Sequence, residues 1–212
     1  MIPPPWADAA RALFGAMPPT AVARVLADAA WRLLTDRPFA ALEPAADARE
    51  RASRAQVAPV VAFYRALLRQ VAPHEALRLT AAAVDAGALG HLARTLPELA
   101  RGRGPSAFHS GGAATMHAEG ERMLARFFTA TARVVSAGPD HLAFTVTACA
   151  LHRLVTALGH PELAPLFCAA DGRFFGALGL TLERPTTLAS GGASCPFTVR
   201  RTPNLAPTAG PS

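Results

Sequence analysis

The sequence predicts an α+β fold in which a helical N-terminal half is followed by a small antiparallel sheet with packed helices. Apolar residues recur at three- and four-residue spacing through about residue 135, which is typical of amphipathic helices, whereas alternating residues and glycine-rich turns follow residue 140. Hydrophobic residues make up 51% of the 212 positions and charged residues 17%, enough for one sizeable core. We therefore expect a single domain over residues 1–202, with 1–135 mostly helical, a sheet region over 140–202, and a disordered, proline-rich tail over 203–212.

Helices are predicted in order through the first half of the chain. Thr20 follows two prolines and is expected to cap a helix that runs to about residue 36. Two more helical patterns cover residues 42–70 and 72–99. A glycine-rich stretch at 100–114 is the longest clear loop, and it is either a lid or a plain connector. Residues 116–137 are predicted to form one further helix with a broad apolar face.

The last third of the chain changes to strand-like alternation. Residues 141–149 place apolar and small polar side chains on opposite faces, and a short helix over 150–159 follows them. Residues 176–184 and 194–201 are predicted strands joined by a turn-rich connection. Pro196 cannot donate a ladder hydrogen bond, so the last strand is expected to lie at an edge or to begin near this proline.

The charged residues exclude several kinds of chemistry. All 21 basic residues are arginine, so the chain has neither a lysine for a Schiff base with pyridoxal phosphate nor one for a P-loop. The arginines are scattered, which favours a solvated surface over a nucleic-acid-binding stripe. No stretch reaches the roughly 18 apolar residues of a membrane span, and the first residues do not resemble an export signal. We expect a cytoplasmic protein without nucleic-acid or membrane partners; whether it is a homo-oligomer stays open.

The three cysteines, Cys149, Cys168 and Cys195, all lie in the last third, each near the boundary of a predicted element, and Cys168 is expected in the turn region that follows the helix over 150–159. Each could be a small buried hydrophobic residue, which is the commonest role of a free cysteine. Zinc binding is a second interpretation, but the spacing lacks the close cysteine pair of a zinc knuckle. The third is catalysis by a thiolate, which requires a lowered thiol pKa and a neighbouring acid or base.

Charged side chains near Cys168 strengthen the catalytic interpretation. Asp171 lies three residues later, within reach if the segment is helical, but a carboxylate beside a thiol raises the thiol pKa and therefore does not activate it. His152 and His160 are candidate bases, although each could equally be a surface or capping residue. Arg184 shares the parity of the apolar strand face before it, and its carboxylate partner is either Asp171 or a substrate.

These residues resemble the C-terminal motifs of the L-2-amino-thiazoline-4-carboxylic acid hydrolases. The resemblance rests on Cys149, on Cys168 with Asp171, on the run "RPTTLASGG" from Arg184 to Gly192, and on Cys195 with Phe197. It covers about 50 residues and implies hydrolytic opening of a small heterocycle that contains sulfur and nitrogen and carries a carboxylate. The three-cysteine spacing is also similar to that of 4-vinyl reductase domains, which implies a non-catalytic, small-molecule-binding module as the alternative.

The resemblance also implies roles for individual residues. We expect Cys168 to be the nucleophile, Asp171 to hold a substrate nitrogen, and Arg184 to bind the substrate carboxylate. Cys195 is a second candidate thiol because it lies beside Gly191 and Gly192, whose N–H groups could face an anion. We expect neither a metal nor another cofactor. The predicted catalytic residues are Cys168, Asp171 and Cys195, and the predicted substrate-binding residues are Arg184, Thr187, Gly191, Cys149 and His152.

Overall fold

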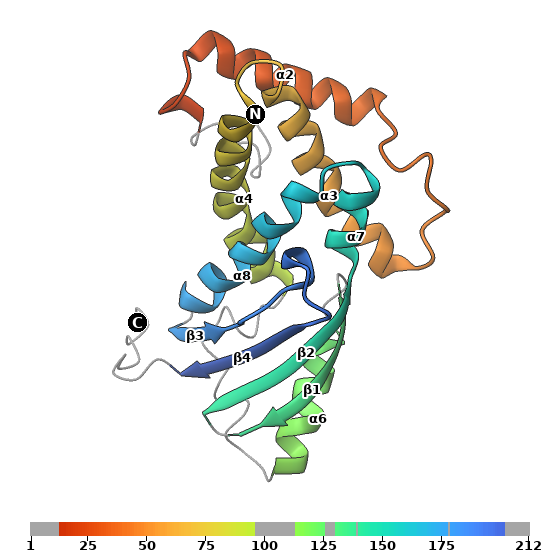
Figure 1. Cartoon of the computed structure of the whole chain (residues 1–212), viewed down its shortest axis with the longest axis vertical. Helices are drawn as coiled ribbons and strands as arrows, with labels where there is room; N and C mark the ends of the chain where they lie inside the picture. Colours follow the sequence, from red (N-terminus) through yellow and green to blue (C-terminus); the bar gives the residue numbers. More distant parts are fainter. Residues whose placement is uncertain (1–12, 96–112, 126–129, 139, 178, 202–212) are drawn as a thin grey trace.

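The protein has a helical part and a four-stranded antiparallel sheet, which confirms the predicted α+β class (Figure 1). The computed structural model describes residues 13–95, 113–125, 130–138, 140–177 and 179–201. The described helices are α2 (Pro19–Thr35), α3 (Ala48–Leu67), α4 (Pro73–Thr95), α6 (Ala113–Leu124), α7 (Ala150–Ala157) and α8 (Ala164–Ala177). The strands are β1 (Ala130–Ala137), β2 (His141–Cys149), β3 (Leu180–Glu183) and β4 (Cys195–Arg201), and two short 3₁₀ turns are η2 (Pro161–Leu163) and η3 (Leu188–Ser190).

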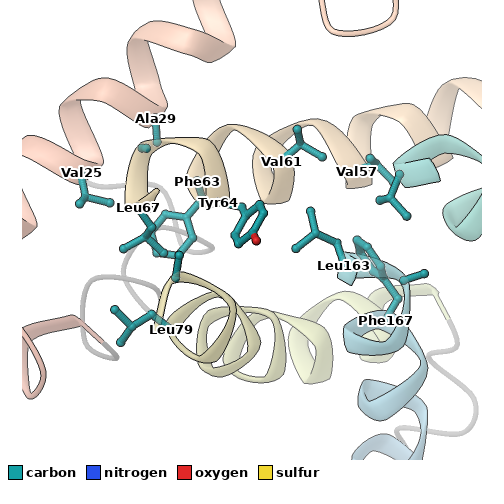
Figure 2. Close-up of a cluster of buried hydrophobic side chains, with 14 of the residues drawn as sticks. Val25, Ala29, Val57, Val61, Phe63, Tyr64, Leu67, Leu79, Leu163 and Phe167 are labelled. Carbon is teal, nitrogen blue, oxygen red and sulfur yellow. The ribbon is translucent and has the colours of Figure 1, made fainter. Parts of the chain in front are cut away.

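The helical part has its own apolar core. Helix α2 begins at Pro19, so that Pro18 and not Thr20 occupies the N-cap position. At the start of α3 the Asp47 side chain accepts a hydrogen bond from Glu50 N–H over 2.8 Å, a typical N-cap. Buried side chains from α2, α3, α4, η2 and α8 converge in one cluster (Figure 2); among them are Val25, Ala29, Val57, Val61, Leu67, Leu79, Leu163 and Phe167.

The sheet has the strand order β1-β2-β4-β3, and every neighbouring pair is antiparallel. The register places Phe144 opposite Phe197 and Val146 opposite Cys195. Alternate residues of β2 and β4 are buried on one face, as the alternation in the sequence predicts. This face packs against α6 and the C-terminal end of α8, and the two helices cover a second apolar cluster.

The strand β1 corrects the prediction of one helix over residues 116–137. Helix α6 ends at Leu124, and Ala130–Ala137 forms an edge strand paired with β2. The β-branched residues Thr131, Val134 and Val135 fit a strand better than a helix. The apolar residues of this segment could be fitted to a helical spacing, so the change to the two-residue alternation of a strand was not recognised.

Two further expectations are corrected by the structure. Cys168, which was placed in a turn region, lies inside α8, and the helix brings Asp171 onto the same side one turn later. Strand β4 lies between β2 and β3, so the edge position for Pro196 is wrong. The alternative is confirmed, because β4 begins at Cys195, immediately before the proline.

Some predictions fall on residues that the structure does not describe. The disordered tail predicted over 203–212 and most of the loop predicted over 100–114 lie outside the described residues, which resume at 113. The described helices include none with both the length and the apolar character that crossing a membrane requires.

Candidate functional site

A cavity lies where the two apolar clusters meet, between the buried face of the sheet, helices α7 and α8, and the η3 turn. Its volume is about 90 Å³. The walls are mostly apolar, and the polar groups in them are the three cysteines, His152, Asp171 and Arg184. The apolar lining comes from Ala130, Ala132, Phe144, Val146, Leu151, Ala164, Phe167, Phe175, Leu188, Ala189 and Phe197. Six of the eight predicted site residues therefore line one cavity, although they come from five different elements or connections.

Cys149 and His152 are placed by the junction of β2 and α7. Cys149 is the last residue of β2 and the N-cap residue of α7, where its backbone is still extended. The pKa of the Cys149 thiol is raised, mainly by burial. The backbone N–H groups of His152 and Leu151, in the first turn of α7, lower this pKa in part. Cys149 also packs against both apolar clusters, so it lies at the boundary between the helical part and the sheet.

Arg184 follows β3 and joins three parts of the site. Its guanidinium donates to Asp171 Oδ2 over 2.8 Å and to the backbone carbonyl of Cys168 over 2.6 Å. The same group lies over the Phe197 ring, 4.8 Å from the ring centre, and Phe197 also stacks on Phe144. With 11% of the side chain exposed, Arg184 is a largely buried cation held by a carboxylate, a carbonyl and an aromatic face.

The low-polarity cavity changes the acidity of Asp171 and Cys168. Burial raises the pKa of Asp171 to about 6, against the opposite effect of the Arg184 charge and hydrogen bond. Burial also raises the pKa of Cys168 to about 11; Arg184 lowers it in part, whereas Asp171 adds to the increase. The Asp171 side chain is 32% exposed because it lines the cavity. At neutral pH the site therefore holds a carboxylate that is ready to accept a proton and a thiol that keeps one.

Cys195 is held by the turn that precedes β4. The Leu188 N–H donates to Cys195 Sγ over 3.1 Å. Thr187 is the N-cap of η3, and its side chain and that of Ser190 exchange hydrogen bonds with each other's backbone N–H in a capping box. Gly191 ends the turn at a φ of 85°, a left-handed conformation that favours glycine. Thr187 and Gly191, predicted to bind substrate, thus shape the turn that presents Leu188 and Ala189 to the cavity.

His160 lies away from the cavity, in the corner between α7 and η2. Its Nε2 accepts a hydrogen bond from Arg65 Nε over 3.0 Å, and its Nδ1 is 3.2 Å from a Glu162 carboxylate oxygen. The ring also makes an edge contact with Tyr64. His160 therefore joins α3 to the corner, and among the two histidines considered as bases only His152 faces the site.

Comparison with known proteins assigns the chain to a family. The model of the L-2-amino-thiazoline-4-carboxylic acid hydrolase family matches residues 50–199, well over half of the chain. The chain belongs to this family. The match includes every residue of the site, from Ala130 to Phe197, together with α4, α6 and nearly all of α3. No curated protein and no solved structure gives a significant match to the chain.

For this member of the L-2-amino-thiazoline-4-carboxylic acid hydrolase family, the sequence indicated the polar residues of the cavity. It did not indicate most of the apolar residues that line it. Phe197 shares the parity of Cys195 on β4, and Phe167 precedes Cys168, so both had a local signal. The alanines of β1 had none, because that segment was predicted to be helical. Within the described ranges no group of three or more histidine, cysteine, aspartate or glutamate side chains is arranged to hold a metal ion.

Proposed function

We propose that the protein is a cofactor-independent hydrolase that opens a small heterocycle containing sulfur and nitrogen, or a related amidine or amide bond, by means of a cysteine nucleophile. The family is named for a hydrolase of this substrate type. The observation that carries the proposal is the convergence of three free cysteines with Asp171 and Arg184 on one cavity. Cysteines that served only as packing residues would not need to share a cavity with a partly buried ion pair.

The paired charges match a substrate that carries both a carboxylate and an amidine-like group. Arg184 presents five N–H donors in a planar fork, and two of them make the contacts with Asp171 and Cys168. A substrate carboxylate can take up further donors of the fork, while Asp171 accepts a hydrogen bond from the substrate nitrogen. The cavity volume of about 90 Å³ is smaller than that of an engineered cavity of about 150 Å³ that binds benzene, so it limits the site to a small substrate.

The reaction begins at the ring carbon that is bonded to both sulfur and nitrogen. A cysteine sulfur adds to this carbon, and the tetrahedral adduct collapses with loss of one ring heteroatom. Water then displaces the cysteine and leaves a carbonyl group at the same carbon. Exclusion of bulk water by the apolar walls strengthens the electrostatic contacts that hold the substrate.

The test compares the wild type with each single cysteine-to-serine variant and with the triple variant Cys149→Ser, Cys168→Ser, Cys195→Ser. The substrate is L-2-amino-thiazoline-4-carboxylate, and ring opening is followed by the appearance of product. We expect turnover by the wild type and a loss of at least about 10³-fold in the triple variant. Turnover by a folded triple variant at the wild-type rate would show that no cysteine is the nucleophile.

A second candidate is a module that binds a small molecule without catalysis. It is favoured by the raised pKa of the Cys149 and Cys168 thiols, because a thiol that stays protonated is a weak nucleophile. The same samples separate the two functions by calorimetric titration with L-2-amino-thiazoline-4-carboxylate. Saturable binding that is lost in Arg184→Gln, with no product after long incubation, supports the binding module, whereas product formation supports the hydrolase.

A further inference from the structure

The side of α2 that faces solvent is apolar along most of the helix. The helix packs on α3 through its buried residues Val22, Val25 and Ala29, and it lies at the periphery of the helical part (Figure 1). On the other side, Trp31 is 64% exposed and Leu34 is 83% exposed. A surface helix ordinarily presents polar side chains to solvent, so this side of α2 is suited to contact another molecule. We call it the outer stripe; its members are Thr20, Ala23, Ala27, Ala30 and Leu34, flanked by Arg24 and Trp31, and all of them are exposed.

The outer stripe has the residue spacing of a seam between two packed helices. Thr20, Ala27 and Leu34 are seven residues apart, and Ala23 and Ala30 lie between them in the same repeat. Small side chains occupy the first half and the centre of the stripe, whereas the large ones lie near its C-terminal end. In an antiparallel pair of such helices, Ala27 faces Ala30 of the second copy, and Ala23 faces Leu34 of the second copy. Each large side chain therefore meets a small one, and the helices can approach closely at the alanines.

The charges that flank the outer stripe are complementary in the same antiparallel arrangement. Arg24 lies beside Trp31 of the second copy, where the guanidinium can stack on the indole ring in a cation–π contact, and two-fold symmetry repeats this contact. The antiparallel direction also sets the N-terminal end of each helix dipole beside the C-terminal end of the other. A parallel pair would instead set Leu34 against Leu34 and align the two dipoles. The charge pattern of α2 thus favours one direction of self-association.

We infer that the outer stripe of α2 is the interface of a symmetric homodimer, with the two-fold axis between Ala27 and Ala30. A helix of 17 residues is about 25 Å long, and two such helices bury on the order of 1,000 Å² in total, near the lower limit of specific interfaces. We therefore expect a weak dimer, with a dissociation constant of about 10 µM. The residues that line the cavity begin at Ala130, so this inference does not depend on the proposed function.

A lipid surface is the other partner that an exposed apolar helix side can fit. An amphipathic helix that binds anionic lipid carries a strongly basic polar side. The charged side chains of α2 are Arg24, Asp28 and Arg32, and the side opposite the outer stripe is buried against α3. The composition of α2 therefore favours a second copy of the chain over a membrane.

The first experiment measures the mass of the full chain by sedimentation velocity over a range of protein concentrations from about 1 to 200 µM, on both sides of the expected dissociation constant. We expect the mean mass to rise from that of one chain toward that of two. Ala27→Glu sets two carboxylates close to the two-fold axis in an apolar interface, and it should raise the dissociation constant at least about 100-fold. The matched control is Ala55→Glu, which changes an exposed alanine of α3 and should associate as the wild type does.

The second experiment mixes Ala27→Glu with Ala27→Arg. Each variant alone should keep the mass of one chain, because like charges meet at the axis, whereas the mixture should form a dimer that contains one copy of each. Dimer formation by the mixture also shows that both variants fold. The inference is overturned if the wild type keeps the mass of one chain at every concentration, if Ala27→Glu associates as tightly as the wild type, or if the mixture stays monomeric. It is also overturned if the monomer binds vesicles of phosphatidylcholine and phosphatidylglycerol and Ala27→Glu abolishes that binding.

Discussion

Arg184 makes three contacts with two elements: the Asp171 carboxylate and the carbonyl of Cys168 in α8, and the ring of Phe197 in β4. A planar guanidinium can make all three contacts at once, whereas the ammonium of a lysine cannot both stack on the ring and donate in two fixed directions. The parity of Arg184 on its strand indicated from sequence that it needs a carboxylate, and Asp171 was one of the two expected partners. Phe197 as the third contact depends on the strand order, which the sequence did not reveal.

The raised pKa of Asp171 predicts a pH dependence for both activity and stability. If the carboxylate holds a substrate nitrogen, kcat/KM should rise with pH through about 6 in the wild type. Because the folded-state pKa lies above the ordinary value, the folded protein is favoured when the group is protonated, and this stability is lost as pH rises from about 4 through about 6.

The matched control for this prediction is Asp171→Asn, which keeps the shape of the side chain without its titration. The free energy of unfolding, measured by urea denaturation across this pH range, should fall in the wild type relative to the variant as pH rises. A difference between the two proteins that is constant from pH 4 to pH 7 would contradict the raised pKa.

Helix α6 and strand β1 show the consequence of assigning an apolar pattern to the wrong period. Leu124 lies on the predicted apolar helix face and is buried, but the same helix places Val135 on that face, whereas in the structure Val135 is exposed and Val134 is buried. In the fold the two elements pack against each other, and the helix lies close to the sheet at Gly120. A Cβ there would lie 2.9 Å from Val134 Cγ2 and 3.0 Å from Leu142 Cδ1.

Two helical glycines, Gly120 and Gly172, provide a matched test of that close approach. Replacing a helical glycine with alanine stabilises an exposed helix by about 0.5–1 kcal/mol. Gly172 lies in α8 with nothing within 4 Å of its added Cβ, so Gly172→Ala should show this gain. Gly120→Ala should lose it to the contact with the sheet and fall about 1 kcal/mol or more below Gly172→Ala. Urea denaturation measures both, and equal stabilisation by the two substitutions contradicts the predicted packing of α6.

The sequence predicted the helices α2, α3 and α4, strands β2 and β4, and the helix α7, because each has a clear period or a clear stop signal. It predicted a helix in place of β1. It also placed Cys168 in a turn, because the residues around Cys168 are mostly apolar and do not show the polar face of an amphipathic helix. The polar half of the site was predicted because its residues stand out in an apolar context. Which of them touch, and which backbone N–H meets a sulfur, depend on the tertiary arrangement.

At the scale of the whole molecule, α8 links the two apolar clusters. Ala164 and Phe167 belong to the helical cluster, whereas Phe174 and Phe175 belong to the cluster under the sheet. The cavity lies between these two ends of the helix, beside Cys149, which packs against both clusters. The geometry of the site therefore depends on how the two clusters are joined.

Because α8 connects the two clusters, we predict that the helical part and the sheet unfold together. Leu154 is fully buried in the helical cluster, and Leu154→Ala should reduce the free energy of unfolding by about 2–5 kcal/mol. If unfolding is cooperative, amide hydrogen exchange should accelerate in β2 and β4 by the same factor as in α3. Unchanged protection of the strands in the variant would indicate two independent folding units.

The family match begins at residue 50, two residues into α3, and therefore leaves α2 outside. Yet Val22, Val25 and Ala29 of α2 are fully buried in the same cluster as Val57, Val61 and Leu67 of α3. The segment that matches the family model is thus shorter than the segment that this chain needs to cover its own core. A protein shortened to the matched segment would expose an apolar helix face to water, and measurements on such a protein should be interpreted with this exposure taken into account.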